Sequence, residues 1–164
     1  MMIQIIAAVI ATVGFSVLFG VPSKYYPYCG VIGGAGWLVY LLTLEHFSTA
    51  GASLAATMVV IFLSRLAAVR KKCPVTIFLI AGIFPLVPGA GVYWTAYYIV
   101  TDQLWLAAET GYTAVKVAVA IVLGIVFIFE LPQGLFVRLA GNKQEISKNK
   151  TKDRTQLKIK AVEF

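Results

Sequence analysis

Five apolar segments, each about as long as a membrane-spanning helix, occupy most of the chain. They cover residues 1–19, 26–44, 50–68, 75–100 and 112–137 of 164. A helix needs about 20 mostly apolar residues to cross the hydrocarbon core of a bilayer. Here 60% of the residues are hydrophobic and only 13% are charged, whereas a soluble domain carries about 25% charged residues. The sequence therefore predicts an all-α polytopic membrane protein with about five transmembrane helices.

The segments are expected to form one membrane domain over residues 1–140, followed by a basic tail at residues 141–164. The tail is polar, rich in lysine and without sustained periodicity, which favours a cytoplasmic segment attracted to anionic lipids. The first segment lacks the basic start and the short apolar core of a signal peptide. We therefore interpret it as a retained helix.

The net charge of +7 does not indicate nucleic-acid binding, because the basic residues gather in a few places. Lys24, the cluster at residues 70–72 and the tail follow the first, third and fifth segments. The loops after the second and fourth segments hold Glu45, Asp102 and Glu109 but no Lys or Arg. Lys and Arg are enriched in cytoplasmic loops. The pattern predicts a multi-pass inner or plasma membrane protein with an external N-terminus and a cytoplasmic C-terminus.

The fourth segment contains an unusual run near its middle, where residues 82–91 read Gly-Ile-Phe-Pro-Leu-Val-Pro-Gly-Ala-Gly. Proline lacks an amide hydrogen and clashes with the preceding helical turn, and glycine adds backbone freedom. We therefore predict that Pro85 and Pro88 break this helix within the membrane. The freed backbone groups of such a break are tolerated where they are buried in protein or line a wet cavity. A purely structural kink is the alternative interpretation.

The predicted break supplies the candidate substrate-binding site. A helix that restarts at Gly89 or Gly91 presents free amides and a partial positive charge, which suit a carboxylate. In many secondary transporters the substrate binds where interrupted helices meet. Pro85 and Pro88 would open the helix, and Tyr93 is the candidate hydrogen-bond partner beside the break.

Three ionisable residues within the apolar segments are candidate charge elements, namely Arg65, Lys116 and Glu130. Arg65 lies near the end of the third segment, shortly before Arg70, so its side chain is expected to extend to the membrane interface. Lys116 and Glu130 lie near opposite ends of the fifth segment. They would be about 21 Å apart along a helix, too far to pair directly.

Four glycines at positions 30, 33, 34 and 36 lie in the first half of the second segment. Small residues let helix backbones approach closely, so we interpret this run as a helix-packing face. A substrate passage beside the glycines is the alternative.

Several kinds of chemistry have no counterpart in the sequence. One histidine and the two distant cysteines, Cys29 and Cys73, cannot form a zinc site. There is no phosphate-binding loop, and no set of acid, base and nucleophile groups suited to catalysis. We therefore expect no metal, no cofactor and no enzymatic activity.

Residues 82–93, which carry the proline-glycine run, resemble the signature of threonine/serine exporter (ThrE-like) membrane proteins. The similarity covers about residues 5–135. Within the family the chain is similar to the small YjjB-type subunit, although its basic tail departs from the compact ending of such subunits. Further features of the same pattern are Gly20-Val21-Pro22, Gly36-Trp37 and Ser64-Arg65.

The resemblance implies a membrane subunit of a two-component secondary exporter of small amino acids or organic acids. Its substrates would be threonine and serine, or dicarboxylates such as succinate. The partner would be a larger YjjP-type membrane subunit, and we expect an oligomer. Two alternatives stay open: a non-transporting scaffold that stabilises or places its partner, and a channel-like facilitator.

Overall fold

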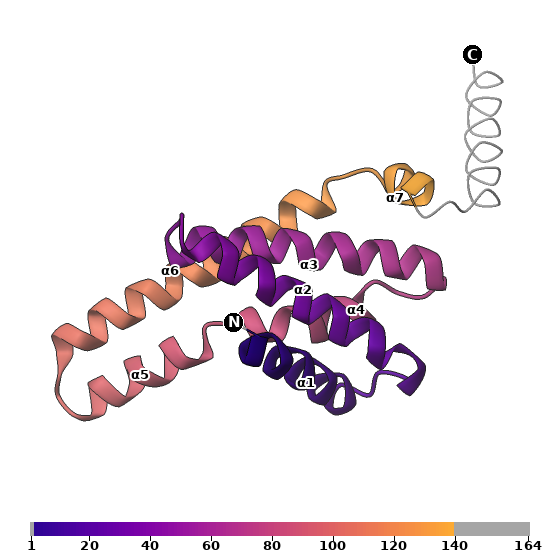
Figure 1. Ribbon diagram of the computed structural model, residues 1–164. Helices are drawn as coiled ribbons and strands as arrows, with labels where there is room; N and C mark the ends of the chain where they lie inside the picture. The colour runs from indigo at the N-terminus through magenta and orange to yellow at the C-terminus, as the bar shows by residue number, and fades with distance from the viewer. Residues whose placement is uncertain (1, 140–164) are drawn as a thin grey trace, which may run out of the picture.

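The computed structural model describes residues 2–139, which form helices joined by short turns, with no strand in this range (Figure 1). The helices are α1 (Met2–Leu18), the 3-10 helix η1 (Ser23–Tyr25), α2 (Tyr26–Leu44), α3 (Thr49–Lys71), α4 (Thr76–Ile83), the 3-10 helix η2 (Phe84–Leu86), α5 (Gly89–Val100), α6 (Leu104–Phe129) and α7 (Gln133–Leu139). The predicted all-α fold is confirmed. The tail predicted at residues 141–164 lies outside the described residues.

Three helical stretches are each long and apolar enough to cross a membrane. They are η1 with α2, then α3, and then α6. The pair formed by α4–η2 and α5 also passes this test, as a span bent by 47°. The helix α1 is apolar but has 17 residues, or about 26 Å, which is the lower limit for a span. The chain is thus a polytopic membrane protein with three to four spans by length and composition, and α1 is the remaining segment of the predicted five.

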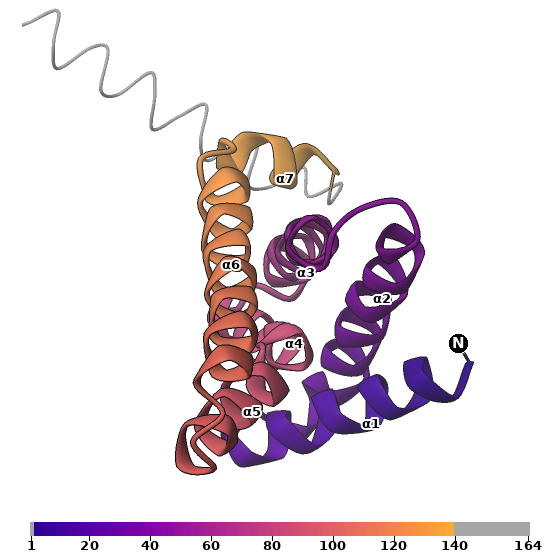
Figure 2. The same ribbon diagram turned by 90° about the vertical axis from the view of Figure 1, so that its left-hand side faces the viewer.

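The short helix α4 lies in the middle of the bundle, packed against α1, α2 and α3 (Figure 2). Its Phe78 side chain is fully buried, and the centre of the ring lies 5.4 Å from that of Tyr25. Next along the same buried face, a Cβ at Gly82 would lie 3.0 Å from the Ile32 side chain. The first half of the broken span is therefore held firmly by its neighbours.

The glycines of α2 lie where α1 and α3 approach it most closely. A Cβ at Gly33 would lie 2.0 Å from Oγ1 of Thr12 in α1, and a Cβ at Gly36 would lie 2.3 Å from the Val60 side chain in α3. No side chain fits at such distances, because packed atoms do not overlap. These contacts support the interpretation of the glycine run as a helix-packing face.

The helices α5 and α6 lie side by side, and their connecting turn extends beyond the turn between α2 and α3 (Figure 1). The Thr95 hydroxyl of α5 lies 3.1 Å from the Thr110 hydroxyl of α6 and links the pair. No residue of α5 is buried. The second half of the broken span therefore packs mainly against α6, and its other faces are exposed on the surface of the protein.

The last apolar segment differs from the predicted range of 112–137. The helix α6 begins at Leu104, because the apolar residues 104–108 precede Glu109 and extend the helix. It ends at Phe129, and α7 begins after Pro132. Proline cannot donate a helical hydrogen bond and disfavours the helical conformation in the residue before it, so the helix stops there.

Candidate functional site

The predicted break lies where η2 ends and α5 begins. Pro85 and Pro88 have no amide hydrogen, so each removes one helical hydrogen bond. Val87 is extended, with ψ of 131°, as expected for a residue before proline. The Gly89 amide then donates to the Val87 carbonyl at 2.7 Å, which closes a tight turn around Pro88. The predicted break of the fourth apolar segment at the proline-glycine run is confirmed, and the structure bends there by 47°.

The helix α5 begins at Gly89 with Pro88 at its N-cap, and no side chain caps its first amides. The Val92 amide donates to the Pro88 carbonyl at 3.1 Å and is the first helical hydrogen bond of α5. The amides before Val92 have no acceptor within the helix, as at any helix start. Such an end carries a partial positive charge of roughly half a unit and suits an anion.

A pocket of about 720 Å³, here called the break pocket, opens at this point. The proline and glycine residues proposed from the sequence, Pro85, Pro88, Gly89 and Gly91, all line it. The other walls come from the second half of α2, the start of α3 and the first half of α6. The lining side chains that can form hydrogen bonds are Trp37, Tyr40, Thr49, Ser53, Trp94, Glu109, Thr110 and Thr113.

One of these side chains, Glu109, sets the chemistry of the break pocket. Glu109 is the one carboxylate among the lining residues, which include no Lys, Arg or His. The indole nitrogen of Trp37 is buried and has no hydrogen-bond acceptor within residues 2–139. Because this nitrogen is buried, it does not face the pocket and is not offered to a ligand there. The pocket therefore combines the Glu109 carboxylate with the positive end of α5.

Tyr93, the fifth residue proposed from the sequence, does not line the break pocket. Its side chain is 63% exposed, and its ring packs against that of Trp94 with the centres 5.4 Å apart. Neighbouring residues of a helix point about 100° apart. The helix therefore directs Trp94, rather than Tyr93, towards the pocket.

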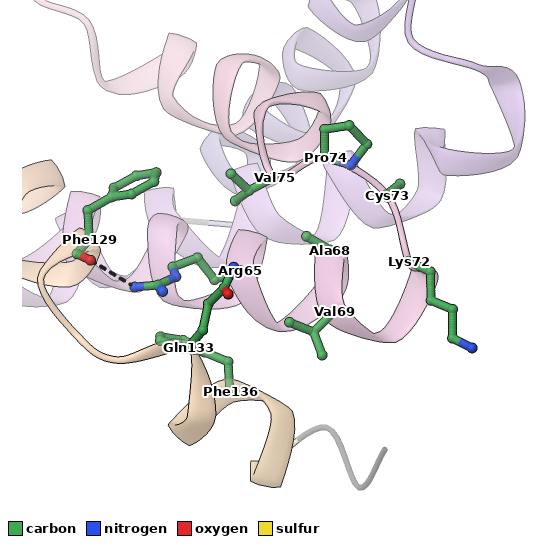
Figure 3. A pocket seen from close by; sticks show the side chains of 10 residues that line it. All are labelled: Arg65, Ala68, Val69, Lys72, Cys73, Pro74, Val75, Phe129, Gln133 and Phe136. Carbon is green, nitrogen blue, oxygen red and sulfur yellow. Dashed lines mark hydrogen bonds between the residues drawn. The ribbon is translucent and has the colours of Figure 1, made fainter. Parts of the chain in front are cut away.

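Arg65 lies near the other end of α3 and lines a second pocket, here called the Arg65 pocket (Figure 3). Its side chain is only 9% exposed. The Nη1 group donates to the carbonyls of Ile128 and Phe129, the latter at 3.4 Å, and the Phe136 ring lies 4.1 Å from the guanidinium carbon. Arg65 thus binds the last carbonyls of α6, where a cation is favourable.

The other two candidate charge elements lie apart from both pockets. Lys116 is exposed near the middle of α6, with its Nζ 4.6 Å from the centre of the Tyr112 ring. It lies beside the first turns of α3, since Ala50 and Gly51 line the same shallow groove. Glu130 is exposed at the C-cap of α6. The three charge elements are therefore not brought together.

The sequence did not identify the polar walls of the break pocket. Trp37, Tyr40, Thr49 and Ser53 come from helices whose packing order no local pattern reveals. The position of Glu109 within a helix could have been predicted from the sequence, because residues 104–108 are apolar and indicate that the helix starts before residue 112. The predicted start assigned Glu109 to a loop, whereas it lies in the first turns of α6 and lines the pocket.

Residues 4–130 match the protein family described as Threonine/Serine exporter, ThrE. The chain belongs to this family. The match covers nearly all of the helices from α1 to α6 and includes every residue that lines the break pocket. The ThrE resemblance seen in residues 82–93 is thereby confirmed, and the protein is an exporter-type transporter embedded in a membrane. No solved structure matches this ThrE-family chain.

Proposed function

We propose that this chain is the membrane subunit of a two-component secondary exporter of small amino acids, working with a larger YjjP-type partner. The observation that carries the proposal is the break pocket. It combines the open N-terminus of α5 with Glu109 inside the part of the chain that matches the ThrE family. This pairing supports recognition of a substrate that carries both a negative and a positive group.

An amino acid has both groups. Its carboxylate suits the amides at the start of α5, and its ammonium group suits the Glu109 carboxylate, through charge-assisted hydrogen bonds. The hydroxyl of threonine or serine can bind the hydroxyls of Thr49 and Ser53, which line the same pocket. A dicarboxylate such as succinate has no ammonium group and would be repelled by Glu109. The pocket therefore favours threonine and serine over succinate.

The partner is proposed to cover α5. No residue of this helix is buried, and the aromatic side chains of Tyr93, Trp94 and Tyr97 are exposed on it. In transporters built from related halves, the substrate site forms where interrupted helices from the two halves meet. One broken helix supplies half of such a site, so a second one from the partner would complete it.

The test is efflux of threonine, serine and succinate from loaded bacterial cells. The cells express this chain alone, a YjjP-type partner alone, or both. We expect threonine and serine export only when both proteins are present, with little change in succinate export, because each chain supplies half of the site.

Two results would count against this function. Export by the partner alone at the level of the pair would make this chain a non-transporting scaffold. Export that follows the concentration gradient and is unchanged after the proton gradient is collapsed would indicate a channel-like facilitator. Immunoblots of the membrane fraction must show equal insertion of both proteins in all strains.

A further inference from the structure

The Arg65 pocket, at the opposite end of α3 from the break pocket, has no part in the proposed transport site. It has a volume of about 600 Å³ and lies between the end of α3, the turn into α4, the end of α6 and the start of α7. Two of the residues that line it, Arg65 and Lys72, are cationic, and none is acidic. The positive charge of this pocket therefore favours an anionic ligand.

Arg65 retains donors that can reach such an anion. A guanidinium has five N–H donors, and the bonds to Ile128 and Phe129 come from Nη1 alone. The other two nitrogens have no hydrogen-bond acceptor within residues 2–139, and they belong to a side chain that lines the pocket. They can therefore donate to a ligand there. Figure 3 shows the Arg65 side chain between Phe129 and the α7 residues Gln133 and Phe136.

Lys72 supplies the second cation. It is the C-cap of α3 and adopts a left-handed backbone conformation, with φ of 54°. Its side chain is exposed and lies at the rim of the pocket, with the ammonium group directed away from Arg65 (Figure 3). A lysine has a flexible four-carbon stem, so this ammonium group can turn towards an anion held by Arg65.

Apart from Gln133, the remaining walls are mostly apolar, and they lie where the long apolar helix α3 ends. Val69, Val75, Phe129 and Phe136 line the pocket beside the two cations, and the basic cluster at residues 70–72 marks the end of the α3 span. A free small anion gains nothing from contact with an apolar wall. A phospholipid has a phosphate close to its acyl chains, so it can contact both the cations and the apolar wall. Basic pockets between membrane helices are suited to lipid head groups, and a guanidinium matches phosphate geometry.

We propose that the Arg65 pocket binds the phosphate of an anionic phospholipid, and that the part of an acyl chain nearest the head group packs against the apolar wall of the pocket. Arg65 holds the phosphate from inside the pocket, and Lys72 closes over it from the rim. The site is separate from the break pocket and needs no transport activity to be detected.

The experiment measures lipid binding to the purified full-length protein in detergent by native mass spectrometry. Phosphatidylglycerol, phosphatidylcholine and inorganic phosphate are the three probes. Lys72→Asn removes the rim cation and keeps the backbone conformation, because asparagine tolerates a left-handed φ. Arg70→Gln is the matched control, since it removes one unit of the same net charge of +7 from a neighbouring residue outside the pocket.

We expect the unaltered protein to prefer phosphatidylglycerol over phosphatidylcholine. Lys72→Asn should weaken phosphatidylglycerol binding about fivefold, whereas Arg70→Gln should change it by less than about twofold. An equal loss in both variants would overturn the proposal in favour of diffuse surface attraction. Inorganic phosphate that binds as tightly as phosphatidylglycerol would overturn the lipid as the source of the anion.

Discussion

At the scale of single residues, Arg65 shows how an apolar helix accommodates a charge. The sequence indicated a cation near the end of a span, and the side chain was expected to reach the interface. In the structure the guanidinium finds acceptors at the last carbonyls of α6 and an aromatic face in Phe136. Those partners lie more than 60 positions along the chain, so no local pattern could reveal them.

Arg65→Lys is predicted to lower the stability of the folded protein. Lysine keeps the charge but cannot reproduce a planar group that stacks on Phe136 while bonding two neighbouring carbonyls. We expect a loss of about 1–2 kcal/mol, seen as a lower thermal unfolding midpoint in detergent. The exposed Arg70→Lys change is the control and should leave the midpoint unaltered. Equal midpoints for both variants would contradict the role of Arg65 at the end of α6.

At the scale of elements, the broken span was the feature best specified by the sequence. Pro85 and Pro88 remove hydrogen bonds wherever they occur, so the break could be located to within a few residues. Its surroundings could not be located, because they depend on how α2, α3 and α6 pack. Glu109 was assigned to a loop for a related reason, since the apolar start of α6 was taken to lie outside the span.

Replacing Pro88 and Gly89 together by alanine is predicted to reduce threonine efflux about tenfold or more while leaving membrane insertion intact. Alanine at position 88 restores an amide and lets Val87 become helical, which would close the open start of α5. Gly14→Ala is the control, because a Cβ there also has no atom within 4 Å and Gly14 lies in α1, outside the pocket. Normal efflux by the inserted double variant, measured beside that control, would show that the break is not needed.

At the scale of the whole molecule, composition alone predicted a helical membrane protein, because no soluble fold could hide so many apolar side chains. The number of spans was harder to predict, since α1 has 17 residues and lies at the lower limit of length. We propose that α1 does cross the membrane, which gives an external N-terminus. The alternating charges around Lys24 and Glu45 support this orientation.

Labelling with a membrane-impermeant thiol reagent tests this orientation, in a background where Cys73 is replaced by serine and the fully buried Cys29 is kept. Both Lys24 and Glu45 are exposed, so cysteine at either position can react. Glu45→Cys should be labelled in intact cells, and Lys24→Cys only after the cells are made permeable. The reverse pattern would mean that the protein is inserted the other way round.

The central claim is that the break pocket recognises an amino acid through Glu109. The most direct test is threonine efflux from cells that contain both subunits and carry either Glu109→Gln or the control Glu45→Gln, which changes an exposed glutamate outside the pocket. Loss of one charge-assisted bond corresponds to about 1.5–3 kcal/mol, so Glu109→Gln should lower threonine efflux at subsaturating concentration by about tenfold or more. Efflux equal to that of the Glu45→Gln cells, at equal insertion, would contradict the claim.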